Sequence, residues 1–477
     1  KLGYLYAEAA LKPEFTETHG EVDVVFKVDE KEQYQLGRLI IQGNVETQDK
    51  VIRREFSRYG FLPGELFDEA AMEKAQRRLM GSGYFEDVKV SPIGAEPDSR
   101  DALVEVTEGR TGLLLFGVGM DTNSGVMGQI QFSQRNFDAS DHPESFSEFI
   151  TGQAYKGGGQ RFTINLEPGT EVTRGNVSFY EPYLFDQPYY MNINAFHFRR
   201  WRETYYEKRL GGSLTFGHHF ENNWDADITF RMEQISVDDL DDGYALVRDP
   251  ATGELVPQTD GLGNIIYMTR PDPDNPGEVI VITDDEGNPI PKYEVSKITT
   301  APPDVQDVEG DNCLTSIAVG VSRDMTDRMF RPTEGYKLSA SWEQAGAMGG
   351  DFDFSRVQAG VSVFHTVYED LAERRTVLSA RLNGGTIIGD APPFERYYLG
   401  GIGSLRGFDY RGVSPHQGIY YERQRPNGDV VTVFDEDVIG SDSMMLAGVE
   451  LNFPLYEETF FGKIFCDTGM VTEGPYR

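Results

Sequence analysis

Most of the chain alternates apolar and polar residues with a period of two. Ile228 and Phe230, for example, share one face of a segment whose other face carries Thr229 and Arg231. The same alternation recurs from about Thr111 onward, as in the stretches 124–137, 336–343, 355–368 and 444–453. Because successive side chains of a β-strand point to opposite faces, the pattern predicts a long antiparallel β region.

These strands are predicted to form a transmembrane β-barrel rather than a soluble sandwich, which would alternate in the same way. They run for roughly 9–13 residues, close to the length that a tilted membrane strand needs. Charges on the polar face suit a hydrated interior, and Tyr and Phe gather at strand ends, as in residues 180–190. Roughly 13 strands fit into residues 111–477, and bacterial barrels normally have an even number, so we expect this barrel to be incomplete at its C-terminus.

Two long segments, at about 237–312 and 388–442, interrupt the predicted strands. The first holds eighteen acidic residues against four basic ones, with Pro and Gly throughout. It is predicted to be an irregular extracellular loop. Its acidic run at 284–286 raises the question of a Ca²⁺ site, but EF-hand spacing is absent, which favours a solvated loop.

The first 110 residues follow the helical period instead. Thr47 is expected to cap a helix whose apolar stripe includes Phe56, and a second helix is expected to start at Asp68. One strand precedes these helices and two follow them. Residues 33–110 therefore form a predicted β-α-α-β-β module.

The opening residues repeat the end of that module at an offset of about 80. The pair Gly3-Tyr4 matches Gly83-Tyr84, and the alternating Val22, Val24 and Phe26 match Ala102, Val104 and Val106. We expect residues 1–32 to be the C-terminal remnant of a preceding, truncated copy. A chance similarity between two strand pairs is the alternative.

The composition of the chain argues against several classes of function. A net charge of −34 argues against a nucleic-acid partner, and no apolar run approaches the roughly 20 residues of a membrane helix. Cys313 and Cys466 lie far apart and define neither a disulfide framework nor a metal site. No G-x-x-x-x-G-K-[ST] motif for ATP occurs. We therefore expect no cofactor, no metal ion and no ATP-driven step.

The module at 33–110 contains four characteristic runs, IIQGN at 40–44, VIRRE at 51–55, PGELF at 63–67 and GYFEDV at 83–88. With these runs it resembles a POTRA domain. Such domains precede outer-membrane barrels. The resemblance implies that a strand edge around Phe85, Val88 and Val90 binds extended polypeptide by β-augmentation.

The run YYLGGIGSLRGF at 397–408 is the most specific motif in the chain. A glycine-rich turn would account for its glycines, but not for the tetrad Leu405, Arg406, Gly407 and Phe408. Two further stretches accompany it in order along the chain, at 322–336 and 465–469 (FCDTG). With these motifs, nearly the whole chain resembles the BamA-type outer-membrane assembly factors.

That resemblance implies a barrel of about 16 strands and a loop that folds back into it. It implies insertion of β-barrel proteins into the bacterial outer membrane, with the POTRA modules in the periplasm, and no enzymatic reaction. The implied partners are unfolded outer-membrane β-barrel clients, accessory periplasmic lipoproteins or other assembly subunits, and the lipid bilayer.

An arginine that returns into a barrel needs carboxylate partners, because an unpaired buried charge costs several kcal/mol. Alternation places Glu450 on the polar face of its strand. The resemblance implies that Glu450 and Asp467 both meet Arg406. Strict alternation, however, puts Asp467 on the same face as Phe461 and Phe465. A β-bulge could re-aim it, but nothing in the sequence demonstrates one.

The resemblance further implies a weak seam at the first strand of the barrel, where an incoming client strand pairs. The expected seam residues are Phe116, Gly117, Val118, Gly119 and Met120. The two glycines suit a weak, adjustable edge.

Three other functions are compatible with parts of the sequence. A two-partner secretion pore, or a translocation relative, would use the same architecture to move a polypeptide across the membrane. A passive porin would not need the POTRA-like repeat. An enzyme would use His219 with Asp225 or Asp227 to activate water, but the sequence defines no third partner.

Overall fold

A computed structural model of the protein describes residues 3–15, 22–121, 124–145, 147–148, 154–220, 222–273, 275, 277–328, 330–456 and 460–472. The chain forms two compact units. The first comprises Lys1–Gly117, Gln129–Asn165 and Asn176–Ile193, and the second comprises Val118–Gly128, Leu166–Gly175 and Asn194–Arg477.

The chain opens with a hairpin in which β1 (Glu8–Phe15) pairs antiparallel with β2 (Val22–Asp29). Gly3 precedes this hairpin with a φ of +77°, and Gly83 has a φ of +74°. Only glycine adopts this left-handed conformation without strain. The two glycines thus share a left-handed φ, and the origin of residues 1–32 as a truncated copy stays a prediction.

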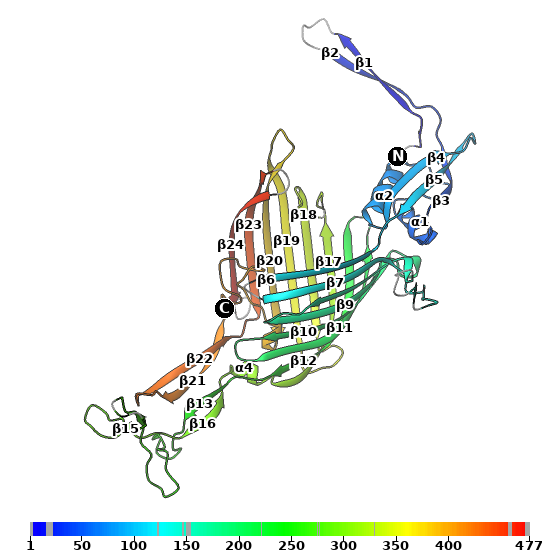
Figure 1. The fold of residues 1–477 in the computed structure, drawn as a ribbon. Helices are drawn as coiled ribbons and strands as arrows, with labels where there is room; N and C mark the ends of the chain where they lie inside the picture. The colour runs from blue at the N-terminus through cyan, green and yellow to red at the C-terminus, as the bar shows by residue number, and fades with distance from the viewer. Residues whose placement is uncertain are drawn as a thin grey trace. The chain divides into compact units, whose positions relative to one another are not determined.

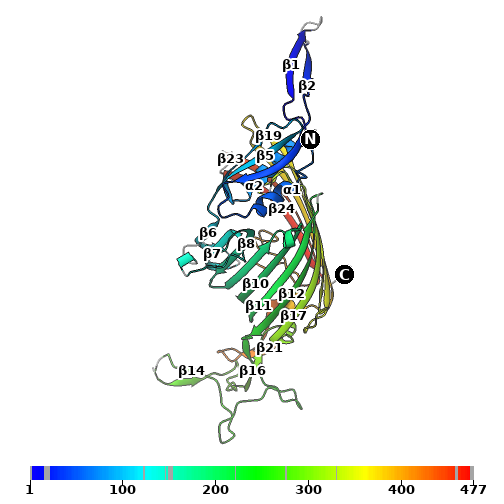
Figure 2. The same ribbon diagram turned by 90° about the vertical axis from the view of Figure 1, so that its right-hand side faces the viewer.

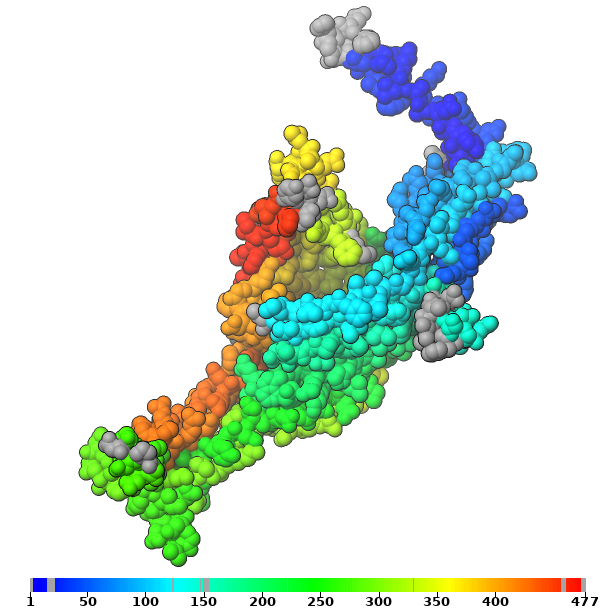
Figure 3. Space-filling model, in the orientation of Figure 1, coloured from blue at the N-terminus to red at the C-terminus, as the bar shows by residue number. Residues whose placement is uncertain are grey.

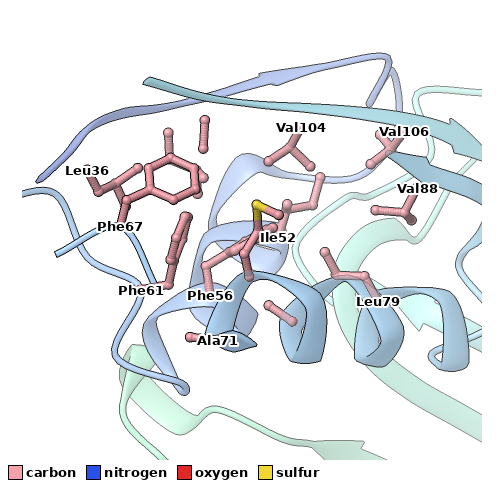
Figure 4. Close-up of a cluster of buried hydrophobic side chains, with 14 of the residues drawn as sticks. Leu36, Ile52, Phe56, Phe61, Phe67, Ala71, Leu79, Val88, Val104 and Val106 are labelled. Carbon is pink, nitrogen blue, oxygen red and sulfur yellow. The ribbon is translucent and has the colours of Figure 1, made fainter. Parts of the chain in front are cut away.

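The first complete module consists of β3 (Gln35–Gln42), α1 (Asp49–Ser57), α2 (Glu69–Gly81), β4 (Phe85–Ile93) and β5 (Ser99–Glu108). Its sheet has the order β3-β5-β4, with β3 parallel and β4 antiparallel to the central β5. Ile52 and Phe56 of α1 and Leu79 of α2 are fully buried against Val88 and Val104 of the sheet (Figure 4). The amphipathic stripes read from the sequence form this core.

The two helices begin in different ways. Asp68 caps α2, as expected, by accepting the N–H groups of Ala70 (3.0 Å) and Ala71 (3.2 Å). Thr47 does not cap α1, since Gln48 occupies the N-cap position. Instead, the Glu108 carboxylate of β5 accepts the backbone N–H groups of Val45, Glu46 and Thr47 at 3.0, 2.9 and 2.6 Å. A distant strand therefore holds the turn that leads into α1.

Replacing Glu108 with Gln is expected to destabilise the turn that leads into α1 by about 2 kcal/mol, because hydrogen bonds to a charged group are lost. Burial opposes ionisation of Glu108, but the hydrogen bonds from Thr47, Glu46 and Val45 lower its pKa below 4.5. The stabilisation is therefore complete above pH 4.5 and disappears as the pH falls through the lowered pKa. Hydrogen exchange of the amides in residues 45–52 measures it, and the exposed Glu105→Gln serves as control. Equal protection in both variants would contradict the prediction.

The large sheet contains thirteen strands within the described part of the chain, and its order follows the sequence from β6 to β24 (Figure 1). The strands are β6 (Gly112–Asp121), β7 (Gly125–Phe137), β8 (Lys156–Glu167), β9 (Val172–Glu181), β10 (Tyr189–Trp201), β11 (Tyr206–His219), β12 (Trp224–Asp238), β17 (Gly310–Asp324), β18 (Gly335–Ala345), β19 (Phe354–Glu369), β20 (Arg375–Gly389), β23 (Ser443–Tyr456) and β24 (Phe460–Thr472). The predicted fold class, a POTRA-like module followed by a large antiparallel sheet, is confirmed.

The two faces of the sheet differ in character. On β23, Met445 and Val449 are about half exposed, as are Ile464 and Met470 on the neighbouring β24. Glu450 lies on the opposite face, where it forms ion pairs. We call these the apolar and the polar face. Separately, no helix among the described residues is both long and apolar enough to cross a membrane.

The acidic insert is not irregular, contrary to the expectation from its composition. It contains the ladders β13 (Asp242–Leu246) with β16 (Val295–Thr299) and β14 (Thr269–Pro271) with β15 (Val279–Val281), followed by α4 (Pro303–Gln306). Asp260 and Asp284 each close a tight turn by accepting two backbone N–H groups. Part of the acidic content therefore serves turns, for which Asp is well suited.

Short elements also occur in other connections. The second long loop carries η2 (Pro393–Glu395) and a hairpin of β21 (His416–Gln424) and β22 (Val430–Val438). A 3₁₀ turn, η1 (Leu184–Asp186), connects β9 and β10.

Candidate functional site

The loop between β20 and β23 folds onto the polar face of the second unit. Its two ends pair with each other, because the N–H of Tyr397 donates to the Ser441 carbonyl (2.9 Å) and the N–H of Ser441 donates to the Tyr397 carbonyl (3.0 Å). Two leucines of the glycine-rich run, Leu399 and Leu405, are buried against Leu446 of β23. These apolar contacts place the motif next to β23 independently of its ion pairs.

Glycine is required where the loop turns back on itself. Gly400 has a φ of +119°, and a Cβ at this position would lie 2.3 Å from the Asp409 carbonyl oxygen. The Ser404 hydroxyl closes the same turn, donating to the Gly400 carbonyl (3.0 Å) and accepting the Gly400 N–H (2.9 Å). This turn fixes the backbone immediately before Arg406.

Arg406 binds two carboxylates on adjacent strands. Its Nε donates to Asp467 Oδ2 (2.5 Å) and its Nη2 to Asp467 Oδ1 (2.7 Å), while Nη1 lies 2.7 Å from Glu450 Oε1. The guanidinium also lies 3.7 Å from the centroid of the Phe465 ring. The hydrogen bonds to Asp467 raise the pKa of Arg406 further above its ordinary value. Bidentate geometry with a stacked ring is specific to arginine, and it ties the loop to β23 and β24.

Asp467 reaches Arg406 in regular register, with no β-bulge between it and Phe465. Glu450 lies opposite Phe465, and Gly448 opposite Asp467, in the register of β23 and β24. Directly opposed residues share a face, so Phe465 itself belongs to the polar face. Alternation therefore placed Asp467 correctly with Phe461 and Phe465, and the error was to assign these aromatic residues to the apolar face.

Further cations complete the group around Arg406. Arg381 of β20 approaches Asp467 Oδ1 at 3.2 Å, and Lys463 approaches Glu450 Oε2 at 2.7 Å. Gly448 leaves space for this arrangement, because a Cβ there would lie 2.6 Å from Asp467 Oδ1 and 2.8 Å from Arg381 Nε. Three cations thus share two carboxylates, and we call these five residues the Arg406 latch.

A second group of ion pairs, which the sequence did not reveal, holds the beginning of the same loop. Its members are four arginines and four glutamates: Arg202, Arg209, Arg231, Arg356, Glu207, Glu233, Glu343 and Glu395. We call these eight residues the ionic cage. Glu395 belongs to the loop, and most of the others occupy alternate positions on the polar face of neighbouring strands. That alternation was visible in the sequence, but the contact with the loop was not.

Comparison with known proteins identifies the family. The family model of the Omp85 superfamily domain matches residues 155–477, which is more than half of the chain. The chain belongs to the Omp85 superfamily. A second family model, POTRA, described as a surface antigen variable number repeat, matches residues 34–109.

Individual relatives agree with this assignment. The outer membrane protein assembly factor BamA of Nitratidesulfovibrio vulgaris is 24% identical over 425 residues, covering 87% of this chain and 42% of that protein. The chain spans less than half the length of the first curated relatives that it matches. The crystal structure of Haemophilus ducreyi BamA lacking POTRA domains 1–3 superposes with a TM-score of 0.59 at 20% identity, covering 99% of this chain and 78% of that one. CdiB from Escherichia coli superposes with a TM-score of 0.50 at 12% identity, covering 99% and 72%. Both structures show that the fold is shared.

The acidic insert of this Omp85 protein contacts the loop that carries the latch. Arg248 pairs with both carboxylate oxygens of Glu422 in β21, with the Nε and Nη2 hydrogen bonds measuring 2.9 and 2.8 Å. Asp304 of α4 accepts hydrogen bonds from Arg396 (2.6 Å) and Gln417 (3.0 Å). The β13–β16 ladder and the β21–β22 hairpin lie side by side in both ribbon views and touch in the space-filling view (Figures 1, 2 and 3). The insert therefore stabilises the β21–β22 hairpin of the loop through these contacts.

The expected seam residues all lie in β6, which forms one edge of the large sheet among the described strands. Phe116, Val118 and Met120 are 71%, 86% and 82% exposed. No heavy atom lies within 4 Å of a Cβ built on Gly119, so packing does not require glycine there.

The expected POTRA edge residues lie in an edge strand, with two of their side chains turned into the core. Phe85, Val88 and Val90 lie in β4, an edge strand of the module, but the side chains of Phe85 and Val88 are 5% and 2% exposed and belong to its core. Because they are buried, the side chains of Phe85 and Val88 cannot contact a client polypeptide. The edge can offer only its backbone groups.

The structure brings His219 and Asp225 together as directly opposed residues of β11 and β12, with a hydrogen bond between Nδ1 and Oδ1. Cross-strand register accounts for this contact. Both side chains are about one-third exposed near the hairpin end.

Proposed function

We propose that this protein inserts β-barrel proteins into the bacterial outer membrane, with its POTRA module in the periplasm. The observation that carries the proposal is the presence of an edge strand in each of two sheets of one chain, β4 in the module and β6 in the large sheet. Unpaired backbone groups at an edge bind extended polypeptide with little dependence on sequence. Clients would first add to the module and then to β6.

The energy for this process comes from the client. Inside a membrane every backbone polar group must be satisfied, so a strand that pairs with β6 gains its hydrogen bonds as it enters lipid. The protein acts as a template and performs no chemical reaction. Unfolded outer-membrane β-barrel proteins, other assembly subunits and the lipid bilayer are its proposed partners. The similarity to BamA along most of the chain supports this assignment.

Reconstitution tests the proposal. The protein is placed in liposomes, a urea-unfolded outer-membrane β-barrel protein is added, and the gel shift of the folded client is followed over time against empty liposomes. We expect faster folding in the presence of the protein. Folding at the rate of empty liposomes would reject the proposal.

A polypeptide secretion pore of the two-partner type is the alternative, because CdiB has the same fold. Ion conductance in planar bilayers distinguishes it. Absent client folding together with large, stable conductance would favour the pore.

A further inference from the structure

Glu395 is nearly inaccessible to solvent and is surrounded by arginines from three strands. Its side chain is 3% exposed. Oε1 lies 2.8 Å from Arg209 Nη1 of β11, while Oε2 lies 3.1 Å from Arg231 Nη2 of β12 and 2.7 Å from Arg356 Nη2 of β19. Arg356 also donates to the Glu395 carbonyl (2.6 Å), so the backbone is held together with the side chain.

The ionic cage is balanced only while Glu395 is charged. It has four arginines and four glutamates, and the other three glutamates each lie on a strand of the sheet. Burial would raise the pKa of Glu395, but the charges of Arg231, Arg209 and Arg356 lower it to about 2. Glu395 is therefore ionised throughout the physiological pH range. Without its carboxylate, four largely inaccessible guanidinium groups would face three carboxylates.

The chain between the cage and the latch has little freedom. Two residues after Glu395, Tyr397 pairs with Ser441 across the base of the loop. Leu399 and Leu405 are then buried against Leu446, with the Gly400 turn between them. Contacts with the base of the loop and with Leu446 thus hold the chain at several points between Glu395 and Arg406.

We propose that Glu395 is a positioning residue that sets where the loop begins, so that Arg406 arrives between Glu450 and Asp467. The loop then spans the polar face between two fixed points, the strands β11, β12 and β19 at Glu395 and the strands β23 and β24 at Arg406. This inference concerns the geometry of the loop. Its consequence for client insertion rests on the proposed function.

A purely structural role would also make Glu395 important, since the cage connects neighbouring strands. Glu343 supplies a matched control, because its carboxylate belongs to the same cage but lies on β18. It approaches Arg231 at 3.2 Å and Arg356 at 2.9 Å and accepts a hydrogen bond from Ser316 (2.6 Å). Loss of either carboxylate unbalances the cage by one charge, but only Glu395 is part of the loop.

The experiment measures the coupling between Arg406 and Asp467 with a double-mutant cycle of Arg406→Ala and Asp467→Asn. The cycle is made in the parent, Glu395→Gln and Glu343→Gln backgrounds, with the rate of chymotrypsin cleavage after Phe408 and Tyr410 as readout. We expect a coupling of about tenfold in the parent and in Glu343→Gln, falling to about twofold or less in Glu395→Gln. Unchanged coupling in Glu395→Gln, or an equal fall in both backgrounds, would overturn the proposal.

Two additions keep the test decisive. If Glu395→Gln does not fold, Glu395→Asp replaces it. This variant keeps the charge but shortens the side chain, so it cannot reach all three arginines, and coupling as strong as in the parent would overturn the proposal. Client folding is measured in parallel on the same proteins. Lost coupling with unchanged client folding would uphold the positioning role while contradicting its link to the proposed function.

Discussion

Replacing Arg406 with alanine is expected to release the loop from β23 and β24 and to lower the resistance of the folded protein to heat and protease. Asp467, only 2% exposed, would keep Arg381 as its remaining cation, at 3.2 Å. Removing one partner of a buried ion pair costs about 3–5 kcal/mol. Because Arg406 is 17% exposed and Arg381 and Lys463 remain, we expect a destabilisation of about 2–3 kcal/mol.

The measurement is the temperature at which the liposome-bound protein unfolds in a gel-shift assay, together with chymotrypsin cleavage within residues 397–441. Arg406→Lys keeps the charge but loses the bidentate pair and the stacking on Phe465, so it should recover only part of the stability. Arg423→Ala, an exposed arginine of β21 in the same loop, is the matched control and should behave as the parent does. If Arg406→Ala were as resistant as Arg423→Ala, the latch would not hold the loop.

Local patterns predicted much of this molecule. The apolar stripe with Phe56 predicted α1, and the period of two predicted the strands, because each pattern reflects the face that its element buries or exposes. Glu450 could be placed on the polar face for the same reason. Asp467 could not, because we assumed that Phe465 belongs to the apolar face. An aromatic ring on the polar face is stable here because the Arg406 guanidinium stacks on it.

Features that depend on distant contacts were missed. Nothing near Thr47 shows that Glu108, about sixty residues later, accepts its N–H group. The same holds for Glu395, whose three arginines come from strands that lie up to 186 residues away. One ladder of the acidic insert joins β13 to β16 across the intervening β14–β15 pair. In each case the residue type was visible in the sequence, but its partner was fixed only by tertiary structure.

Proline substitutions in β6 are expected to have two distinct effects. One position should affect the stability of the sheet, and the adjacent position should affect only the insertion of clients. Along an edge strand, successive N–H groups point alternately toward the paired neighbour and toward the open side. Proline has no N–H to donate. Of the adjacent variants Val118→Pro and Gly119→Pro, one therefore removes a hydrogen bond to the rest of the sheet, and the other removes only a donor of the free edge.

We expect one of these variants to unfold at a lower temperature in the gel-shift assay and the other to unfold as the parent does. The variant of parental stability should nevertheless lose most of the acceleration of client folding, because a client strand can no longer accept a hydrogen bond at that position. Val118→Thr, which keeps the N–H and the β-branched shape, controls for the lost apolar side chain and should retain the activity. A stable proline variant with full activity would show that clients do not pair with β6. The β4 edge of the POTRA module would then be the only strand edge left in the proposal.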